Sequence, residues 1–196
     1  MKKLIIFVGA PGSGKSSRGE ECEKKGGYEY ISTSRALQKL GYDLANAKSI
    51  PDFVTIDIIK DAIKNSKEEK IIVDGFTRLL RQAELLTKEN IKIDQIVYFK
   101  INKSQARKRI MDRIICSECG RTYAENESTK SPKNKGLCDK CNAPLIKRNS
   151  DDLLIFDKRF SFFYRFTYPI LQYFKEQGVK VKIVNAIDNF DITQII

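Results

Sequence analysis

Two short stretches of the sequence hold residues whose types and spacing could do chemistry. The first, GAPGSGKSS at residues 9–17, fits the pattern G-x-x-x-x-G-K-[ST]. Glycines in such a loop let the backbone wrap closely around phosphate oxygens, and the lysine reaches the β- and γ-phosphates of a nucleotide. The N–H groups at the start of the next helix favour an anion, and a serine hydroxyl can ligate Mg²⁺. We therefore predict a nucleotide-binding loop made of Gly9, Ala10, Pro11, Gly12, Ser13, Gly14, Lys15, Ser16 and Ser17.

The second stretch, residues 116–141, contains four of the five cysteines in two C-x-x-C pairs. The pairs are Cys116 with Cys119 and Cys138 with Cys141, and 18 residues separate them. This spacing is typical of a tetrahedral four-thiolate zinc site, which has no open position for chemistry and is therefore structural. A metal would supply the folding free energy that such a polar segment cannot obtain from an apolar core. Cys22 stands apart on a helical stretch and is predicted to be a packing residue.

An alternation of strands and helices must position these two stretches. Short apolar runs rich in Ile and Val predict strands at residues 3–9, 70–75, 95–101 and 179–184, and residues 28–32 (YEYIS) give a weaker pattern for a fifth strand. Helical patterns are found at residues 14–26, 34–40, 53–66, 78–89, 103–114 and 151–177. This alternation indicates an α/β fold of the P-loop NTPase type, with a parallel five-stranded sheet and helices on both faces. The polar residues 116–149 interrupt it as an insertion that resembles a zinc ribbon.

The balance of charges suggests an anionic ligand but does not identify one. The chain has 36 Lys and Arg against 25 Asp and Glu, which gives a formal net charge of +11. This excess is compatible with a polyanionic partner, with a solvated lysine-rich surface, or with arginines gathered around small phosphorylated ligands. No apolar run approaches the roughly 18 residues that a membrane span needs. The apolar run 4–8 follows basic residues, as in a signal peptide, but leads directly into the glycine loop. We therefore expect a buried first strand, no membrane partner and a cytoplasmic protein.

Further motifs follow the glycine loop along the chain. They are ISTSRALQ (31–38), KSIPD (48–52), VDGFTRLLRQAELL (73–86), RIMDR (109–113), RNSDDLLIFDKRF (148–160) and FTYPILQYF (166–174). Together with the loop they resemble the adenylate kinases, the nucleoside monophosphate kinases that interconvert ATP, AMP and ADP. The resemblance implies a core domain at 1–30, 53–114 and 150–196, a short AMP-binding segment at 31–52, and a zinc-binding lid at 115–149. It also implies a monomer that reversibly transfers the γ-phosphoryl group of MgATP to AMP, giving two ADP.

The resemblance assigns roles to individual residues. The expected catalytic residues are the cations Lys15, Arg78, Arg113, Arg148 and Arg159. Arg109 is expected to stack on the donor base and so to complete the ATP site. The expected AMP-binding residues are Thr33, Arg35, Gln38, Gly75, Arg78, Gln82, Arg148 and Arg159. The expected metal ligands are Ser17 and Asp74 for Mg²⁺, directly or through water, and Cys116, Cys119, Cys138 and Cys141 for structural Zn²⁺.

The acceptor side departs from the family pattern. The arginine that binds the AMP phosphate in the family is Gln38 here, and the family's aspartate is Arg35. These two side chains are three residues apart on a predicted helix and share one face, so we expect Arg35 to take part in holding the phosphate. Thr77 replaces a proline, and the stretch Arg148-Asn149-Ser150-Asp151 lacks one of two family carboxylates. These departures bear on the choice of acceptor more than on the type of reaction.

Three alternatives to an adenylate kinase follow from the same residues. The chain could phosphorylate another monophosphate, such as GMP, CMP or UMP. It could be a basic zinc-ribbon ATPase that binds nucleic acid, although the ribbon holds only one aromatic residue, Tyr123, and lies at the lid position. It could also be a P-loop ATPase or switch without kinase activity, which the retained arginines argue against. We expect nucleotide partners and no nucleic acid.

Overall fold

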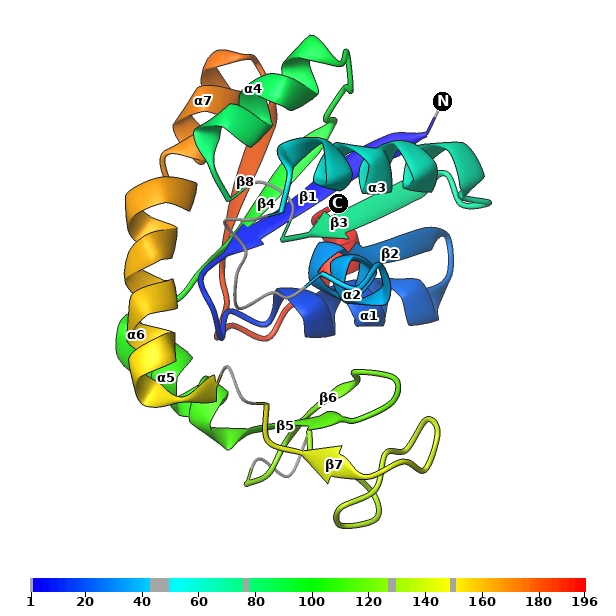
Figure 1. Ribbon diagram of the computed structural model, residues 1–196, viewed down its shortest axis with the longest axis vertical. Helices are drawn as coiled ribbons and strands as arrows, with labels where there is room; N and C mark the ends of the chain where they lie inside the picture. The colour runs from blue at the N-terminus through cyan, green and yellow to red at the C-terminus, as the bar shows by residue number, and fades with distance from the viewer. Residues whose placement is uncertain (1, 43–49, 76–77, 127–129, 149–150) are drawn as a thin grey trace.

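The architecture comes from a computed structural model, which describes residues 2–42, 50–75, 78–126, 130–148 and 151–196. Its centre is a five-stranded parallel sheet with the strand order β2-β3-β1-β4-β8 (Figure 1). The strands are β1 (Lys3–Gly9), β2 (Tyr28–Ser32), β3 (Lys70–Asp74), β4 (Gln95–Lys100) and β8 (Lys180–Asn185). The prediction of a parallel five-stranded sheet is therefore confirmed.

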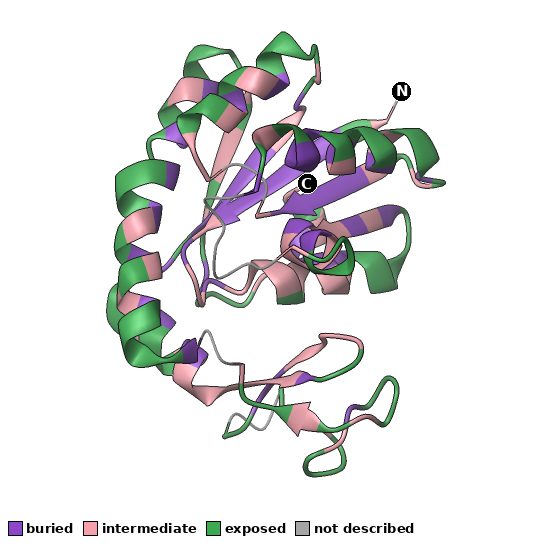
Figure 2. Ribbon diagram, viewed as in Figure 1, coloured by how far each residue is buried: buried purple, intermediate pink, exposed green. Residues whose placement is uncertain are grey.

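The sheet forms because its central strands are almost continuously apolar. β1, β3 and β4 are buried along most of their length, which is the pattern of parallel strands covered on both faces (Figure 2). The edge strand β8 instead alternates between half-buried and exposed residues. The apolar core therefore lies along the three middle strands, and these strands fix the positions of the loops at their carboxyl ends.

Helices cover the two faces of the sheet. They are α1 (Lys15–Lys25), α2 (Thr33–Lys39), α3 (Asp52–Asn65), α4 (Leu80–Lys88), α5 (Lys103–Asp112), α6 (Leu153–Phe162) and α7 (Ile170–Glu176). α1 packs on one face with the C-terminal turn η4 (Ile192–Gln194), while α3, α4 and α7 lie on the other (Figure 1). None of the helices described here is both long enough and apolar enough to cross a membrane.

The predicted helix 151–177 is wrong in one respect, because three elements occupy that range. α6 passes into a π-helical turn, η3 (Phe163–Thr167), and α7 begins after Pro169. The N–H of Tyr168 donates to the carbonyl of Phe163, five residues back, at 2.8 Å. Pro169 has no N–H to continue the ladder, so a new helix starts there.

The inserted segment forms a small sheet of its own below the core in the view of Figure 1. Its antiparallel strands have the order β6-β5-β7, with β5 (Arg113–Cys116), β6 (Thr122–Ala124) and β7 (Leu145–Ile146). α5 therefore ends at Asp112 rather than at residue 114, because Arg113 already pairs with Ala124. A small cluster of Cys116, Tyr123 and Cys138 takes the place of an apolar core.

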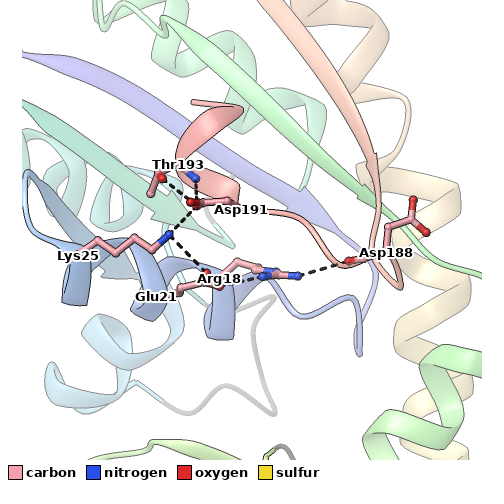
Figure 3. Close-up of polar contacts among 6 residues, drawn as sticks. All are labelled: Arg18, Glu21, Lys25, Asp188, Asp191 and Thr193. Carbon is pink, nitrogen blue, oxygen red and sulfur yellow. Dashed lines mark hydrogen bonds and ion pairs between the residues drawn. The ribbon is translucent and has the colours of Figure 1, made fainter.

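Polar contacts tie the C-terminal segment to α1 (Figure 3). Lys25 Nζ lies 2.7 Å from Asp191 Oδ1, which also accepts hydrogen bonds from the backbone and hydroxyl of Thr193. Arg18 donates to the carbonyl of Asp188 at 3.4 Å, and its guanidinium lies 4.5 Å from the ring centre of Phe190. These contacts anchor the helix that starts at the phosphate loop to the C-terminal segment that follows the last strand, β8.

Candidate active site

The phosphate loop leaves the sheet at a switch point, because β1 has β3 on one side and β4 on the other. Gly12 has φ +83°, and a Cβ there would lie 2.6 Å from the carbonyl oxygen of Ala106 on α5. Only glycine fits such a close approach in this conformation. Lys15 Nζ folds over the loop and donates to the carbonyl of Gly9 at 2.7 Å and to Ser13 Oγ at 3.3 Å. The loop thus has the strand, turn and helix that its motif predicts.

Arg109 lies beside this loop. A Cβ at Gly14 would be 3.7 Å from Arg109 Nη1, so the guanidinium is close to the start of α1. The arginine is on α5, one turn before the lid strand β5. Its expected contact with the donor base stays a prediction.

The five predicted catalytic cations lie within electrostatic reach of one another. Desolvation, together with the charges of Arg148, Arg113 and Arg78, lowers the pKa of Arg159 to about 10. Desolvation also lowers the pKa of Lys15, where Asp74 acts in the opposite direction and Arg159, Arg78 and Arg113 add to the lowering. The pKa values of Arg78 and Arg148 are lowered mainly by desolvation as well. Side chains from α1, β5, α6, the segment before α4 and the segment after β7 therefore build one positive site that favours a polyanion.

Arg113 has a carboxylate partner within this site. Its Nε donates to Asp151 Oδ2 at 2.7 Å and its Nη2 donates to Oδ1, which makes a two-bond ion pair. The carboxylate of Asp151 is almost fully buried, with 4% of its side chain exposed. The residues Asn149 and Ser150, where the family's second carboxylate is missing, lie outside the described residues.

Asp74 is the last residue of β3, next to the phosphate loop, and accepts hydrogen bonds from two hydroxyl groups. Ser16 Oγ donates to Asp74 Oδ2 at 2.7 Å, and the Tyr30 hydroxyl donates to the same oxygen at 3.0 Å. Desolvation and the charge of Asp74 raise the pKa of Tyr30, so the phenol remains a donor. Ser17, which the resemblance suggests as a Mg²⁺ ligand, is exposed. The sequence analysis did not select Tyr30, since a tyrosine in a strand gives no signal of which carboxylate it meets.

On the acceptor side, the side chain of Arg78 lies at the start of α2. Arg78 Nη2 donates to Ser34 Oγ at 3.2 Å, and the carbonyl of Arg78 accepts from the Thr167 hydroxyl at 3.1 Å. In the part of the chain that the structure describes, Thr33 Oγ1 is a buried side-chain oxygen without a hydrogen-bond partner. Because buried hydroxyls are normally paired, this oxygen is available to a ligand. Thr77 lies outside the described residues.

Gln82 uses its amide oxygen and one amide N–H within the protein. Its Oε1 accepts from the backbone N–H groups of Arg78 and Leu79, at 2.8 and 3.2 Å, which caps α4. Its Nε2 donates to Asp52 Oδ1 at 2.9 Å. A base that bonds to Oε1 would have to displace one of these N–H groups, whereas Nε2 has a second N–H to donate; the reading of the acceptor base by Gln82 stays a prediction.

Arg35 reaches toward α1 and the lid. It donates to Glu20 Oε1 on α1, and its guanidinium lies 5.8 Å from the ring centre of Tyr30. A Cβ on Gly120 of the lid would lie 3.5 Å from Arg35 Nε. Gln38 is exposed on the same helix. Residues 43–49 of the short AMP-binding segment 31–52 lie outside the described residues.

The four lid cysteines come together as predicted. Their sulfur atoms all lie within 4.8 Å of one another, with Cys116 Sγ 3.4 Å from Cys141 Sγ and Cys119 Sγ 3.6 Å from Cys138 Sγ. A zinc ion with Zn–S bonds of about 2.3 Å separates its ligands by about 3.8 Å, so the arrangement fits the ion. Burial opposes ionisation of Cys138, but hydrogen bonds from Tyr123 and from the N–H groups of Lys140 and Cys141 lower its pKa to about 6. Such a thiol readily supplies a thiolate ligand.

Comparison with known proteins agrees with this geometry. Residues 7–179 match the sequence profile of the adenylate kinase family. The chain belongs to the adenylate kinase family. An adenylate kinase of Mesomycoplasma hyopneumoniae strain 232 is 33% identical over 189 residues, which cover 90% of this chain and 88% of the relative. One of Bacillus velezensis is 33% identical over 206 residues, covering 96% and 93%, and one of Thermosipho africanus is 30% identical over 200 residues, covering 94% and 92%.

Membership of the adenylate kinase family fixes the class of enzyme. The chain is a nucleoside monophosphate kinase that binds nucleotides at its P-loop, and the resemblance found in the motifs is confirmed. The basic zinc-ribbon ATPase is not favoured, because the match runs through the core and the lid together.

Proposed function

We propose that the chain catalyses ATP + AMP ⇌ 2 ADP with Mg²⁺, using the five cations Lys15, Arg78, Arg113, Arg148 and Arg159. The observation that carries this proposal is their convergence: they come from separate segments of the chain, and the charges of the arginines among them lower the pKa values of Lys15, Arg148 and Arg159. Phosphoryl transfer needs positioning and charge neutralisation rather than a covalent intermediate. A group of cations of this kind is unfavourable alone and becomes favourable with phosphates between its members.

The cations divide between the two nucleotides. Lys15 and the N–H groups of its loop would hold the donor phosphates, and Arg78 would hold the acceptor phosphate beside Ser34. Arg113, Arg148 and Arg159 would surround the transferring group, with Arg113 kept in place by Asp151. Mg²⁺ bound with ATP would neutralise phosphate charge, and Asp74 is the carboxylate placed to hold its water shell. Thr33, Gly75 and Gln82 would complete the AMP site, and Arg109 the ATP site.

The zinc ion proposed for the lid would be structural. A closed Cys₄ site leaves no position for a substrate, but it would fold the polar lid against the core side chains. Support comes from Gly120, between the two halves of the cysteine cluster, which lies next to Arg35. A lid held there would exclude water, which would otherwise hydrolyse ATP.

The acceptor site departs from the family pattern at Arg35 and Gln38. Arg35 is paired with Glu20 and Gln38 is exposed, which supports the proposal that Arg78, beside Ser34, holds the acceptor phosphate. The alternative, a kinase for GMP, CMP or UMP, is not favoured by the adenylate kinase relatives. Incubation with MgATP and each of AMP, GMP, CMP and UMP, followed by identification of the products, tests it. We expect ADP with AMP as acceptor; a clear preference for another monophosphate would contradict the proposal.

We also propose that the chain acts as a cytoplasmic monomer without a nucleic-acid partner. The five cations proposed to bind nucleotide phosphates account for part of the net charge of +11. Sedimentation should give one species near 22.5 kDa. Binding to nucleic acid, tested at low and high salt, should be weak and should vanish as salt rises, since a charge-only contact depends steeply on salt.

A further inference from the structure

Tyr30 lies between the predicted magnesium carboxylate and the acceptor-binding helix. Its hydroxyl donates to Asp74 Oδ2 at 3.0 Å, and the side chains of both residues are largely inaccessible, with 7% exposed in each residue. The two residues come from adjacent strands, β2 and β3, near the ends where the phosphate loop also emerges. Ser16 places a second hydroxyl on the same oxygen, at 2.7 Å.

We propose that Tyr30 is a positioning residue that orients the Asp74 carboxylate toward the Mg²⁺ that arrives with ATP. This inference rests on the proposed function and deepens it. Two hydroxyl groups occupy Oδ2, so this oxygen is held in place and its lone pairs are used. The carboxylate then has one defined orientation, in which Oδ1 is the oxygen left to accept from the water shell that Mg²⁺ keeps in such sites.

The tyrosine ring is held on both sides, which makes its hydroxyl a fixed donor. A Cβ on Gly19 of α1 would lie 2.2 Å from Tyr30 Cδ2, so the ring fills the space beside this residue. Glycine is a poor helix former, and its place within α1 is explained by this contact. On the α2 side the Arg35 guanidinium lies 5.8 Å from the ring centre and pairs with Glu20.

The same contacts link the magnesium carboxylate to the acceptor side. Arg35 is on α2, the helix that also contains Ser34, the partner of Arg78. A shift of α2 on acceptor binding would move Arg35 against the ring of Tyr30. The hydroxyl of Tyr30 would pass this movement to Asp74, so the orientation of the carboxylate depends on both nucleotide sites.

The decisive variant is Tyr30→Phe, which removes the hydroxyl and keeps the ring. Tyr28→Phe is the matched control, because Tyr28 is on the same strand and its hydroxyl meets Lys70 at 3.1 Å instead of Asp74. Mn²⁺ serves as the probe, and its affinity for the protein–ADP complex is measured by electron paramagnetic resonance. We expect Tyr30→Phe to bind Mn²⁺ about three- to tenfold more weakly, the range of one lost hydrogen bond. Metal-free ADP should bind as in the wild type, and Tyr28→Phe should match the wild type throughout.

The Asp74→Asn variant, used as a second background, separates an effect of Tyr30 on the Asp74 carboxylate from an effect on the stability of the fold. In Asp74→Asn, adding Tyr30→Phe should not weaken Mn²⁺ binding further, because the hydroxyl acts through that carboxylate. Equal Mn²⁺ affinity in Tyr30→Phe and the wild type would overturn the inference. So would a loss of Mn²⁺ affinity on adding Tyr30→Phe to Asp74→Asn that is as large as the loss in the wild-type background. A loss of affinity for metal-free ADP as large as the loss of Mn²⁺ affinity would also overturn it. These results leave the proposed function intact if the wild type still forms ADP from ATP and AMP. A wild type that forms no ADP overturns the proposed function and this inference with it.

Discussion

Arg113 and Asp151 form a two-bond ion pair that joins the two ends of the lid to each other. Arg113 is the first residue of β5, and Asp151 is the first residue described after the lid, just before α6. The bonds run from Nε to Oδ2, at 2.7 Å, and from Nη2 to Oδ1. Arg113, a member of the proposed catalytic cluster, thus also holds the two ends of the lid together.

Replacing Asp151 with Asn should affect stability and turnover together. Breaking a buried ion pair by removing one charge costs about 3–5 kcal/mol in the free energy of unfolding, which urea denaturation measures. Arg113 loses its fixed orientation, so kcat should fall about ten- to a hundredfold, the range of a charge-assisted hydrogen bond. Asp152→Asn is the control, because Asp152 caps α6 through Leu154 and Ile155 and asparagine caps equally well. Similar kcat values for the two variants would contradict the role given to the pair.

Lys15→Met should stop phosphoryl transfer while the fold survives. The ammonium is the full positive charge of the phosphate loop, and loss of one such contact commonly costs about 10²–10³-fold in rate. A coupled assay for ADP measures the rate, and circular dichroism checks the fold. Lys24→Met, an exposed lysine near the end of the same helix, should keep normal turnover. Turnover near that of the wild type in Lys15→Met would mean that this loop is not the active site.

Purified protein should contain one zinc ion per chain. Cys119→Ser removes one of four converging ligands, so metal content should fall and the melting temperature should drop. Cys22→Ala alters the fifth cysteine, which is buried in the core outside the cluster, and should leave the zinc content at one. Elemental analysis and thermal melting measure both effects. Full activity and an unchanged melting temperature after chelation would contradict a structural zinc site.

Arg35→Ala tests whether this residue helps to hold the acceptor phosphate. If it does, the KM for the acceptor should rise about ten- to a hundredfold while the KM for ATP stays nearly unchanged. Because Arg35 is paired with Glu20, Glu20→Gln should release the guanidinium and lower the acceptor KM. Gln38→Arg, which restores the family residue, should also lower it. Arg165→Ala, an exposed arginine on η3, serves as control. An unchanged acceptor KM in Arg35→Ala would show that Arg35 does not hold the acceptor phosphate and serves only its contacts with α1 and Tyr30.

The contact between α1 and the C-terminal segment should contribute least to the stability of the fold at acidic pH. Hydrogen bonds from Lys25 and Thr193 lower the pKa of Asp191 to about 2, below the roughly 3.9 of an unfolded chain. A carboxylate with a depressed pKa adds stability above its unfolded pKa and loses it as the pH falls through the folded value. Asp191→Asn should therefore melt below the wild type at pH 7, and the gap should shrink toward pH 2.5. A gap of constant size across this range would show that the charge of Asp191 is not the cause.

The sequence by itself determined the parts of the protein that depend on local chemistry. The glycine loop needs only its own backbone and the strand and helix around it, so GAPGSGKSS identified the nucleotide site. Continuous apolar runs predicted the three central strands β1, β3 and β4, because burial on both faces leaves a continuous apolar pattern. The edge strands β2 and β8 were predicted from weaker or mixed patterns. The spacing of the cysteines identified the metal-type cluster, since two C-x-x-C pairs carry their own geometry.

Only the tertiary structure decided which side chains meet across elements. Ser16 and Tyr30 share one oxygen of Asp74, although 58 and 44 residues separate them from it along the chain. The pairing of Arg35 with Glu20 depends on how α2 packs against α1, and no spacing within either helix encodes it. The Thr167 hydroxyl likewise donates to the carbonyl of Arg78, 89 residues earlier in the chain. Such contacts depend on packing between distant segments, whereas motifs and periodicity record only what each segment can do alone.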